Sequence, residues 1–178
     1  WAEVQKMTLK NQTAEVKTLK VFSFAEWCLW NAATDMENFQ RNFSTGEVEV
    51  EGSTLYHKTE YRERRNHYAF YTVNTEIQGY DTDRESFIGL YNEFAEPEAV
   101  LEGKPRNSFA HGWSPIASHY IEVTLKPGES CDLIFLLGYV ENEQDKKFSA
   151  KKVINKEKAH QLIKKFDTTE KVDAAFAE

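Results

Sequence analysis

Cysteine is scarce in this sequence: its 178 residues contain two, Cys28 and Cys131, and no CxxC pair. A disulfide framework or a structural zinc site needs more cysteines, set at closer spacing. Both cysteines lie in apolar, strand-like runs, so we expect each to be a buried, reduced core residue. Reduced thiols are typical of the cytoplasm, which is the location that we expect.

Long apolar runs and a surplus of positive charge are missing as well. No run approaches the roughly 20 apolar residues of a membrane helix, and no basic stretch followed by an apolar one opens the sequence. The formal net charge is -7, with 22 Lys and Arg against 29 Asp and Glu. Because phosphate backbones attract positive proteins, we expect neither a nucleic acid nor a membrane as partner.

Signature motifs of nucleotide binding and of nucleophilic or zinc catalysis are absent: there is no GxGxxG, Walker loop, GxSxG or HExxH. The run DTDRES at 81–86 resembles the start of a calcium loop, but Ser86 stands where that loop needs glycine, so a turn or a helix cap explains it better. His57 and His67 can face each other across neighbouring strands, as hydrogen-bonded sheet histidines rather than metal ligands. We expect no metal and no cofactor.

What the sequence has is a large apolar and aromatic content, with 40% hydrophobic residues and twelve Phe, which suffices for one core. Alternating patterns predict strands at 4–10 and 19–30, which we expect to pair, and a meander that starts at Gly46 and turns at Gly52-Ser53. Residues 81–115 hold three of the four prolines and predict surface excursions with short helical turns.

A hairpin is predicted from SHYIEVTL and SCDLIFLLGYV, which flank KPGE, a type II turn sequence. The second of these runs is apolar at consecutive positions, so we expect it to lie between two layers.

Two helices are predicted at the C-terminal end. Asn155 is the expected cap of the first, whose apolar face consists of Ala159, Leu162, Ile163 and Phe166. Asp167 and Glu170 form the pattern of a capping box that opens the second helix. Its expected inward residues are Val172, Ala175 and Phe176.

Residues 31–45 break the strand pattern and predict a long ordered loop or a single helical turn, and loops of this length are uncommon unless they are functional. Asn38, Gln40 and Arg41 offer amide and guanidinium groups of the kind that bind sugar hydroxyls. A loop held together by its own hydrogen bonds is the competing interpretation.

Several long runs of the sequence resemble glycoside hydrolase family ninety-four, which includes cellodextrin and chitobiose phosphorylases. The runs are EWCLWNAATDMENFQRNFSTGEVEV, GSTLYHKTEYRERRNHYAFY, GWSPIASH and LKPGESCDLIFLLGYVEN, and the resemblance extends over essentially all 178 residues. It implies a mainly β fold: an antiparallel β-sandwich, as an incomplete supersandwich, followed by two helices of a linker. Residues 1–145 are expected to be the later part of the N-terminal sandwich domain, and residues 146–178 the start of the helical linker.

The resemblance implies inverting phosphorolysis of cellobiose, in which phosphate is a co-substrate and the products are α-glucose 1-phosphate and glucose. The (α/α) six-fold barrel of the family, which carries the general acid, has no counterpart here. We therefore expect a piece of a longer enzyme that is not active by itself.

The family's enzymes are homodimers in which an NFQR loop reaches the acceptor end of the partner's active site. By this resemblance Gln40 and Arg41, with Asn38 beside them, are expected to bind the acceptor sugar. Two alternatives remain open: a stand-alone carbohydrate-binding sandwich module, and a purely structural domain that packs on a barrel without touching the substrate.

Arg41→Ala in the complete enzyme should weaken binding of the acceptor sugar and leave the fold intact, because a charge-assisted hydrogen bond to a hydroxyl is lost. Such a bond contributes about 1.5–3 kcal/mol, so the KM for the acceptor should rise by roughly 10–100-fold. Steady-state kinetics in the phosphorolytic and synthetic directions measure this. Unchanged kinetics in both directions would contradict the assignment.

Overall fold

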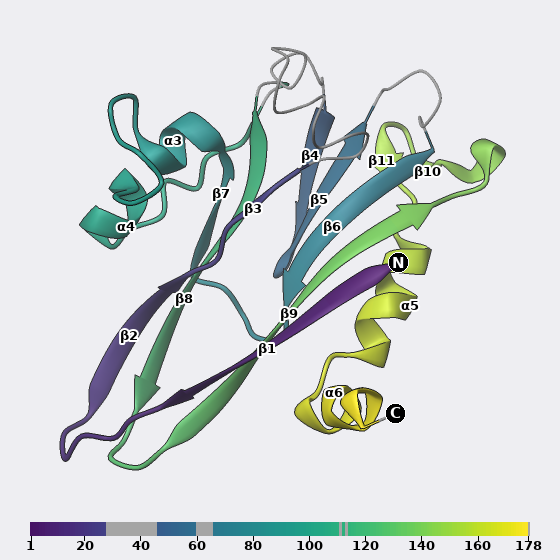
Figure 1. The fold of residues 1–178 in the computed structure, drawn as a ribbon. Coiled ribbons are helices and arrows are strands. Elements are labelled where there is room, and N and C mark those ends of the chain that lie inside the picture. The colour runs from purple at the N-terminus through teal and green to yellow at the C-terminus, as the bar shows by residue number, and fades with distance from the viewer. Residues whose placement is uncertain (28–45, 60–65, 111, 113, 178) are drawn as a thin grey trace.

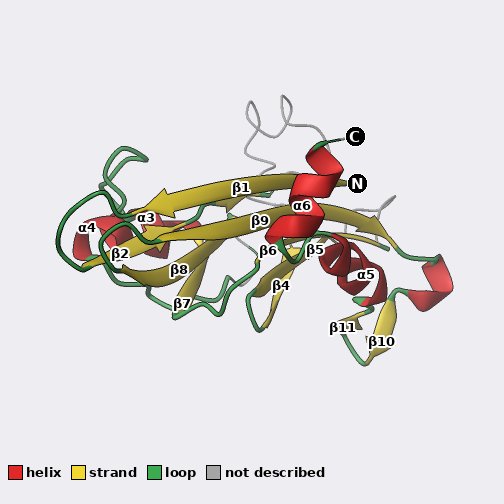
Figure 2. Ribbon diagram, turned by 90° about the horizontal axis from the view of Figure 1, so that it is seen from below, coloured by secondary structure: helices red, strands yellow, loops and turns green. Residues whose placement is uncertain are grey.

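The computed structural model describes residues 1–27, 46–59, 66–110, 112 and 114–177. Its two main antiparallel β-sheets pack against each other (Figure 1). Two helices, α5 (Glu157–Lys165) and α6 (Thr169–Phe176), lie on the outer face of the larger sheet (Figure 2). The predicted mainly β fold, with two helices after the strands, is confirmed. Among the described helices, none has the length and apolar character that crossing a membrane requires.

The larger sheet has five strands in the order β1, β9, β6, β5, β4. They are β1 (Ala2–Lys10), β9 (Ser130–Glu141), β6 (His67–Val73), β5 (Thr54–Thr59) and β4 (Gly46–Glu51). Strands β4, β5 and β6 pair in sequence order, which confirms the meander. The β4–β5 turn contains Gly52 at φ +57°, a left-handed conformation that favours glycine.

The smaller sheet is built around β8 (Pro115–Leu125). One edge of β8 pairs with β2 (Lys17–Phe22) and then with β3 (Ala25–Glu26), while β7 (Gly79–Asp83) pairs along the opposite edge. The strand predicted at 19–30 is thus two strands, interrupted at Ser23. The interruption has a polar cause, since the Ser23 hydroxyl hydrogen-bonds the buried His119 ring at Nδ1, 2.8 Å away.

Two predicted pairings are wrong. Strand β1 pairs with β9 rather than with β2, and β8 pairs with β2 rather than forming a hairpin with β9. The turn between β8 and β9 has the predicted geometry: Gly128 has φ +75°, and the Glu129 N–H donates to the Lys126 carbonyl at 3.0 Å. It connects the two sheets, and the β1–β2 connection runs beside it.

Asn11 joins these two connections. Its backbone N–H donates to the Glu129 carbonyl at 2.9 Å, and its side-chain amide donates to the carbonyls of Leu125 and Glu15 at 2.9 and 2.8 Å. The β1–β2 and β8–β9 connections therefore run side by side from one sheet to the other. As a result, β1 and β2 lie in different sheets, and so do β8 and β9.

The main core fills the space between the two sheets. Its buried residues are Leu55, Tyr71, Val73, Ala117, Ile121, Leu133 and Phe135. A second cluster lies on the outer face of the larger sheet, under α5. Strand β9 contributes to both clusters, Leu133 and Phe135 to the first and Leu136 to the second, so its predicted position between two layers is confirmed.

Helix α5 has the predicted apolar face, but its N-cap is Lys156 and not the predicted Asn155. Asn155 Oδ1 accepts from the Glu157 N–H at 3.1 Å, Ala159 is buried, and the other three predicted apolar residues pack on the second cluster. Before α5, the chain forms a 3₁₀ turn (Gln144–Lys146) and the small strands β10 (Phe148–Ala150) and β11 (Val153–Ile154). The predicted domain boundary after residue 145 stays a prediction.

Helix α6 departs from its prediction in two ways. Its cap is Thr168, whose hydroxyl accepts from the Lys171 N–H, while Asp167 forms an ion pair with the Lys171 ammonium at 2.6 Å. Val172 is its buried residue, whereas Ala175 and Phe176 are exposed. The apolar pattern overstates the buried face because the other contacts of α6 with the sheet are polar: Asp173 forms an ion pair with Lys6, and the Thr169 hydroxyl donates to Asp132.

The excursion between β7 and β8 contains two short helices, α3 (Arg84–Ile88) and α4 (Glu98–Glu102), as predicted. Asp83 caps α3 by accepting from the Ser86 N–H at 2.7 Å. Buried Asp81 accepts from the Arg106 N–H, the Ser108 N–H and the Ser108 hydroxyl. These carboxylates are occupied by the protein's own donors, in agreement with the turn and cap interpretation.

Cys131 is free and only partly buried at the start of β9, so the expectation that it is a buried core residue is wrong. It pairs with Leu9 near the end of β1, where the sheet reaches solvent. Cys28 lies outside the described residues.

Gly138→Ala should destabilise the fold, because a Cβ at this position in β9 would lie 2.2 Å from the ring of the fully buried Phe70. Overpacking of this kind costs about 1–3 kcal/mol, which lowers Tm by roughly 3–10 °C for a chain of this size. Thermal unfolding measures the change. In a double-mutant cycle with Phe70→Leu the cost should fall, and a cost independent of the Phe70 ring would show that this contact is not its cause.

Candidate functional site

The predicted sugar-binding residues Asn38, Gln40 and Arg41 lie outside the described residues, and their assignment stays a prediction. The structure describes both ends of their segment. It leaves the smaller sheet after Trp27, which follows β3, and it enters the larger sheet at Gly46, where β4 begins. The described part of the candidate site consists of the residues that hold these two ends in place.

The first end is fixed by a pair of backbone contacts and an ion pair. Strand β3 pairs Ala25 with Ala117 and Glu26 with Ile116 of β8. The Arg84 Nε donates to Glu26 Oε1 at 2.8 Å, and the Arg84 guanidinium carbon lies 4.8 Å from the centre of the Phe94 ring. Glu26 is thus attached to α3.

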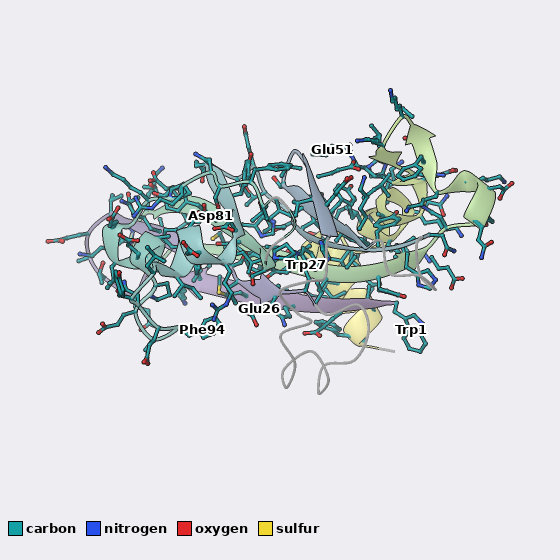
Figure 3. The ribbon with its side chains drawn as sticks, turned by 90° about the horizontal axis from the view of Figure 1, so that it is seen from above. Trp1, Glu26, Trp27, Glu51, Asp81 and Phe94 are labelled. Carbon is teal, nitrogen blue, oxygen red and sulfur yellow. The ribbon has the colours of Figure 1, made fainter. Side chains whose placement is uncertain are left out.

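Trp27 (Figure 3) is the last described residue before the segment, and its ring stacks on that of His57 of β5. The ring centres are 5.6 Å apart and the planes are inclined by 19°. His57 is 4% exposed, and burial lowers its pKa to about 4, so the ring is neutral at pH 7. This contact joins the two sheets at the point where the segment leaves them.

His57 and His67 do not face each other across neighbouring strands, contrary to the prediction. His57 pairs with Ala69 across β6, while His67 Nδ1 hydrogen-bonds the Tyr139 hydroxyl and its Nε2 lies 3.5 Å from Glu141. His67 is the hydrogen-bonded sheet histidine that the sequence predicts. For His57 the described contact is the stack with Trp27, and its buried Nδ1 has no hydrogen-bond partner in the part of the chain that the structure describes.

The second end is fixed by a charged network along β4. Lys58, only 2% exposed, forms ion pairs with Glu47 and, at 3.8 Å, with Glu49, and its ammonium donates to the Lys152 carbonyl at 2.9 Å. Lys156 forms ion pairs with Glu49 and Glu51 at 3.1 and 2.9 Å.

The pKa shifts in this network follow from its hydrogen bonds. The Lys58 ammonium lowers the pKa of Glu47, and the Lys156 ammonium lowers that of Glu51. For Lys156, burial acts to lower the pKa, but the hydrogen bonds to Glu51 and Glu49 outweigh it and the net shift is upward. These shifts favour the charged forms of Glu47, Glu51 and Lys156, and the ion pairs of Lys156 hold β4 to the residues around α5.

Sequence reasoning missed both Lys58 and the Trp27–His57 contact. The alternation of Glu47, Glu49 and Glu51 was a usable signal, because the three carboxylates must lie on one face of a strand. Nothing in the local sequence indicates which lysines meet them.

A cavity of about 440 Å³ lies beside Trp27, between the inner face of the larger sheet and the end of β3. Its lining includes Trp1 and Glu3 of the N-terminal strand, Glu26, Leu137 and Tyr139. Within the described ranges, no three His, Cys, Asp or Glu side chains are grouped so that they could hold a metal ion.

The chain is an antiparallel β-sandwich with two helices on the outer face of its larger sheet. The sequence profile described as "Glycosyl hydrolase 94, supersandwich domain" matches residues 1–169, so the chain belongs to this family.

Curated relatives agree with the family. The chain is 29% identical to N,N'-diacetylchitobiose phosphorylase of Vibrio proteolyticus, over 99% of this chain and 20% of the relative. It is 24% identical to solabiose phosphorylase of Paenibacillus borealis, over 85% of this chain and 20% of the relative. A cyclic beta-(1,2)-glucan synthase, NdvB of Rhizobium meliloti, is 26% identical over 79% of this chain and 5% of its own length. The chain thus spans about a fifth of the length of the phosphorylases that it matches.

The stability of the chain should decrease as the pH falls from 6.5 towards 4. Burial lowers the folded-state pKa of both His57 and His119 to about 4, whereas their ordinary value is 6.5. Below pH 6.5 the unfolded chain binds protons that the folded chain excludes, so the free energy of unfolding falls until the pH nears 4. Urea unfolding at pH 7, 6 and 5 measures this. His57→Gln should reduce the slope, and an unchanged slope would exclude His57 as its source.

Proposed function

We propose that the chain is part of a longer inverting glycoside phosphorylase whose substrate is cellobiose. Its membership of the glycosyl hydrolase 94 supersandwich family is the observation that supports this proposal most directly. Two of the relatives in the family are phosphorylases of disaccharides. The choice of cellobiose depends on the sequence resemblance in the runs around residues 26–71 and 112–142.

In the proposed reaction a general acid protonates the glycosidic oxygen, and phosphate attacks the anomeric carbon from the opposite face. Inversion yields α-glucose 1-phosphate, and the proton leaves with the glucose released as acceptor. The general acid and the residues that bind phosphate belong to the barrel that we expect elsewhere in the longer protein. The 178 residues contribute the scaffold and the segment between Trp27 and Gly46.

We further propose that this segment binds the acceptor sugar in the active site of a second subunit, through Arg41 and Gln40 and with Asn38 beside them. Two described features support the proposal: the segment starts at a Trp27–His57 stack between the sheets, and it ends at a strand held by buried Lys58. Both restrict its ends, and a guanidinium held in position loses little entropy when a sugar binds. On this proposal the complete enzyme is a cytoplasmic homodimer.

A substrate panel tests the proposal. The complete enzyme, given inorganic phosphate and either cellobiose, N,N'-diacetylchitobiose or solabiose, should release sugar 1-phosphate fastest from cellobiose. Without phosphate no product should form, and the 178-residue chain alone should be inactive. Faster turnover of one of the other disaccharides would reject cellobiose, and hydrolysis without phosphate would reject a phosphorylase.

A binding measurement separates the proposal from the stand-alone module. Calorimetric titration of the 178-residue chain with cellobiose should detect no binding at millimolar sugar, because the acceptor site needs a barrel. Saturable binding by the chain alone would instead favour a carbohydrate-binding module.

A further inference from the structure

Strand β1 is the outermost strand of the larger sheet, with β9 as its neighbour on one side (Figure 2). All nine of its residues, Ala2 to Lys10, pair with β9 in an unbroken register. No other strand among the described residues pairs with its second edge. This edge is therefore long, regular and open.

The hydrogen bonds at its two ends show which residues face outward. Trp1 and Tyr139 exchange both backbone bonds, with Tyr139 N–H to Trp1 O at 2.9 Å and Trp1 N to Tyr139 O at 3.2 Å. At the other end the Asn11 N–H donates to Glu129 O at 2.9 Å. In an antiparallel ladder, hydrogen-bonded and non-hydrogen-bonded residue pairs alternate. The backbone N–H and C=O groups of the odd-numbered residues of β1 therefore hydrogen-bond to β9.

The even-numbered residues consequently direct their backbone groups away from β9. They are Ala2, Val4, Lys6, Thr8 and Lys10. Their N–H and C=O groups form the row of donors and acceptors to which another strand can add.

The outer edge of β7 in the smaller sheet differs from the β1 edge, because the chain itself covers it. The outer edge of β7 is covered by the chain around Ser108, whose carbonyl accepts from the Thr82 N–H at 3.2 Å, and Asn107 Oδ1 accepts from the Tyr80 N–H at 3.2 Å. Proline, a bulge or a covering loop blunts an exposed edge, and β1 has none of these among the described residues. The ammonium of Lys6 is engaged with Asp173 of α6 on the outer face.

The cavity of about 440 Å³ adjoins the same edge, because Trp1, Ala2 and Glu3 of the N-terminal end line it together with Leu137. Trp1 is 96% exposed. A strand beside β1 would place alternate side chains on this inner face, next to the cavity, and the others on the outer face near α6. The site therefore fits a strand with large apolar residues on its inner face and polar residues on its outer face.

We propose that the open edge of β1 binds a further β-strand, and that this strand comes from the part of the longer polypeptide outside these 178 residues. The proposal follows from the row of outward backbone groups and from the phosphorylase relatives, of which the chain covers 20% of the length. It does not depend on which sugar the enzyme uses.

Amide hydrogen exchange, resolved by residue, tests the proposal with an internal control. In the 178-residue chain Glu3, Gln5, Met7 and Leu9 should exchange about 100-fold more slowly than Val4, Lys6, Thr8 and Lys10. In the complete protein the second set should slow to the rates of the first. If the second set stays fast in the complete protein, the proposal is wrong. If it slows in the 178-residue chain as concentration rises, the partner is a second copy, which also overturns the proposal.

A proline substitution gives an independent test. Lys6→Pro removes an outward N–H and the ion pair with Asp173, while Lys6→Ala removes the ion pair alone. Proline is tolerated where a strand N–H faces solvent. The difference in Tm between the two variants should therefore be larger in the complete protein than in the 178-residue chain, and equal differences would contradict a strand at this edge.

Discussion

Burial of β9 on both of its faces is the interaction on which the rest of the structure depends. Leu133 and Phe135 close the space between the sheets, and Leu136 and Val140 close the space under α5. The same strand pairs with β1 on one side and with β6 on the other. Because apolar burial is the main favourable term in folding, removing this strand would separate two cores at once. The constraint also explains Gly138, where a side chain has no room beside Phe70.

The sequence predicted the elements better than their partners. Alternation and turn chemistry are local, so they located the meander, the Pro127-Gly128 turn and the apolar face of α5. Pairing is decided by which faces meet in three dimensions, and no local pattern distinguishes a hairpin from a turn that leads into a second sheet. This is why β8 and β9 were assigned to one sheet, and why Phe176 was expected to face inward.

The candidate site was predictable to a smaller extent. The side chains that bind a sugar can be selected by their chemistry, and Asn38, Gln40 and Arg41 fit that chemistry. What supports their segment depends on contacts between residues distant in the sequence, such as Trp27 with His57 and Glu49 with Lys156. Relatives that are a chitobiose phosphorylase, a solabiose phosphorylase and a glucan synthase share this portion of chain.

The lysine network along β4 has a mechanical consequence. Lys156 immediately precedes α5, and its ammonium is tied to Glu49 and Glu51, while Lys58 ties Glu47 to the Lys152 carbonyl. A shift of α5 along the sheet would have to break half-buried ion pairs, which leaves charges poorly solvated. The start of α5 and strand β4 are therefore held together, and the position of Gly46, where β4 begins, is coupled to that of the helix.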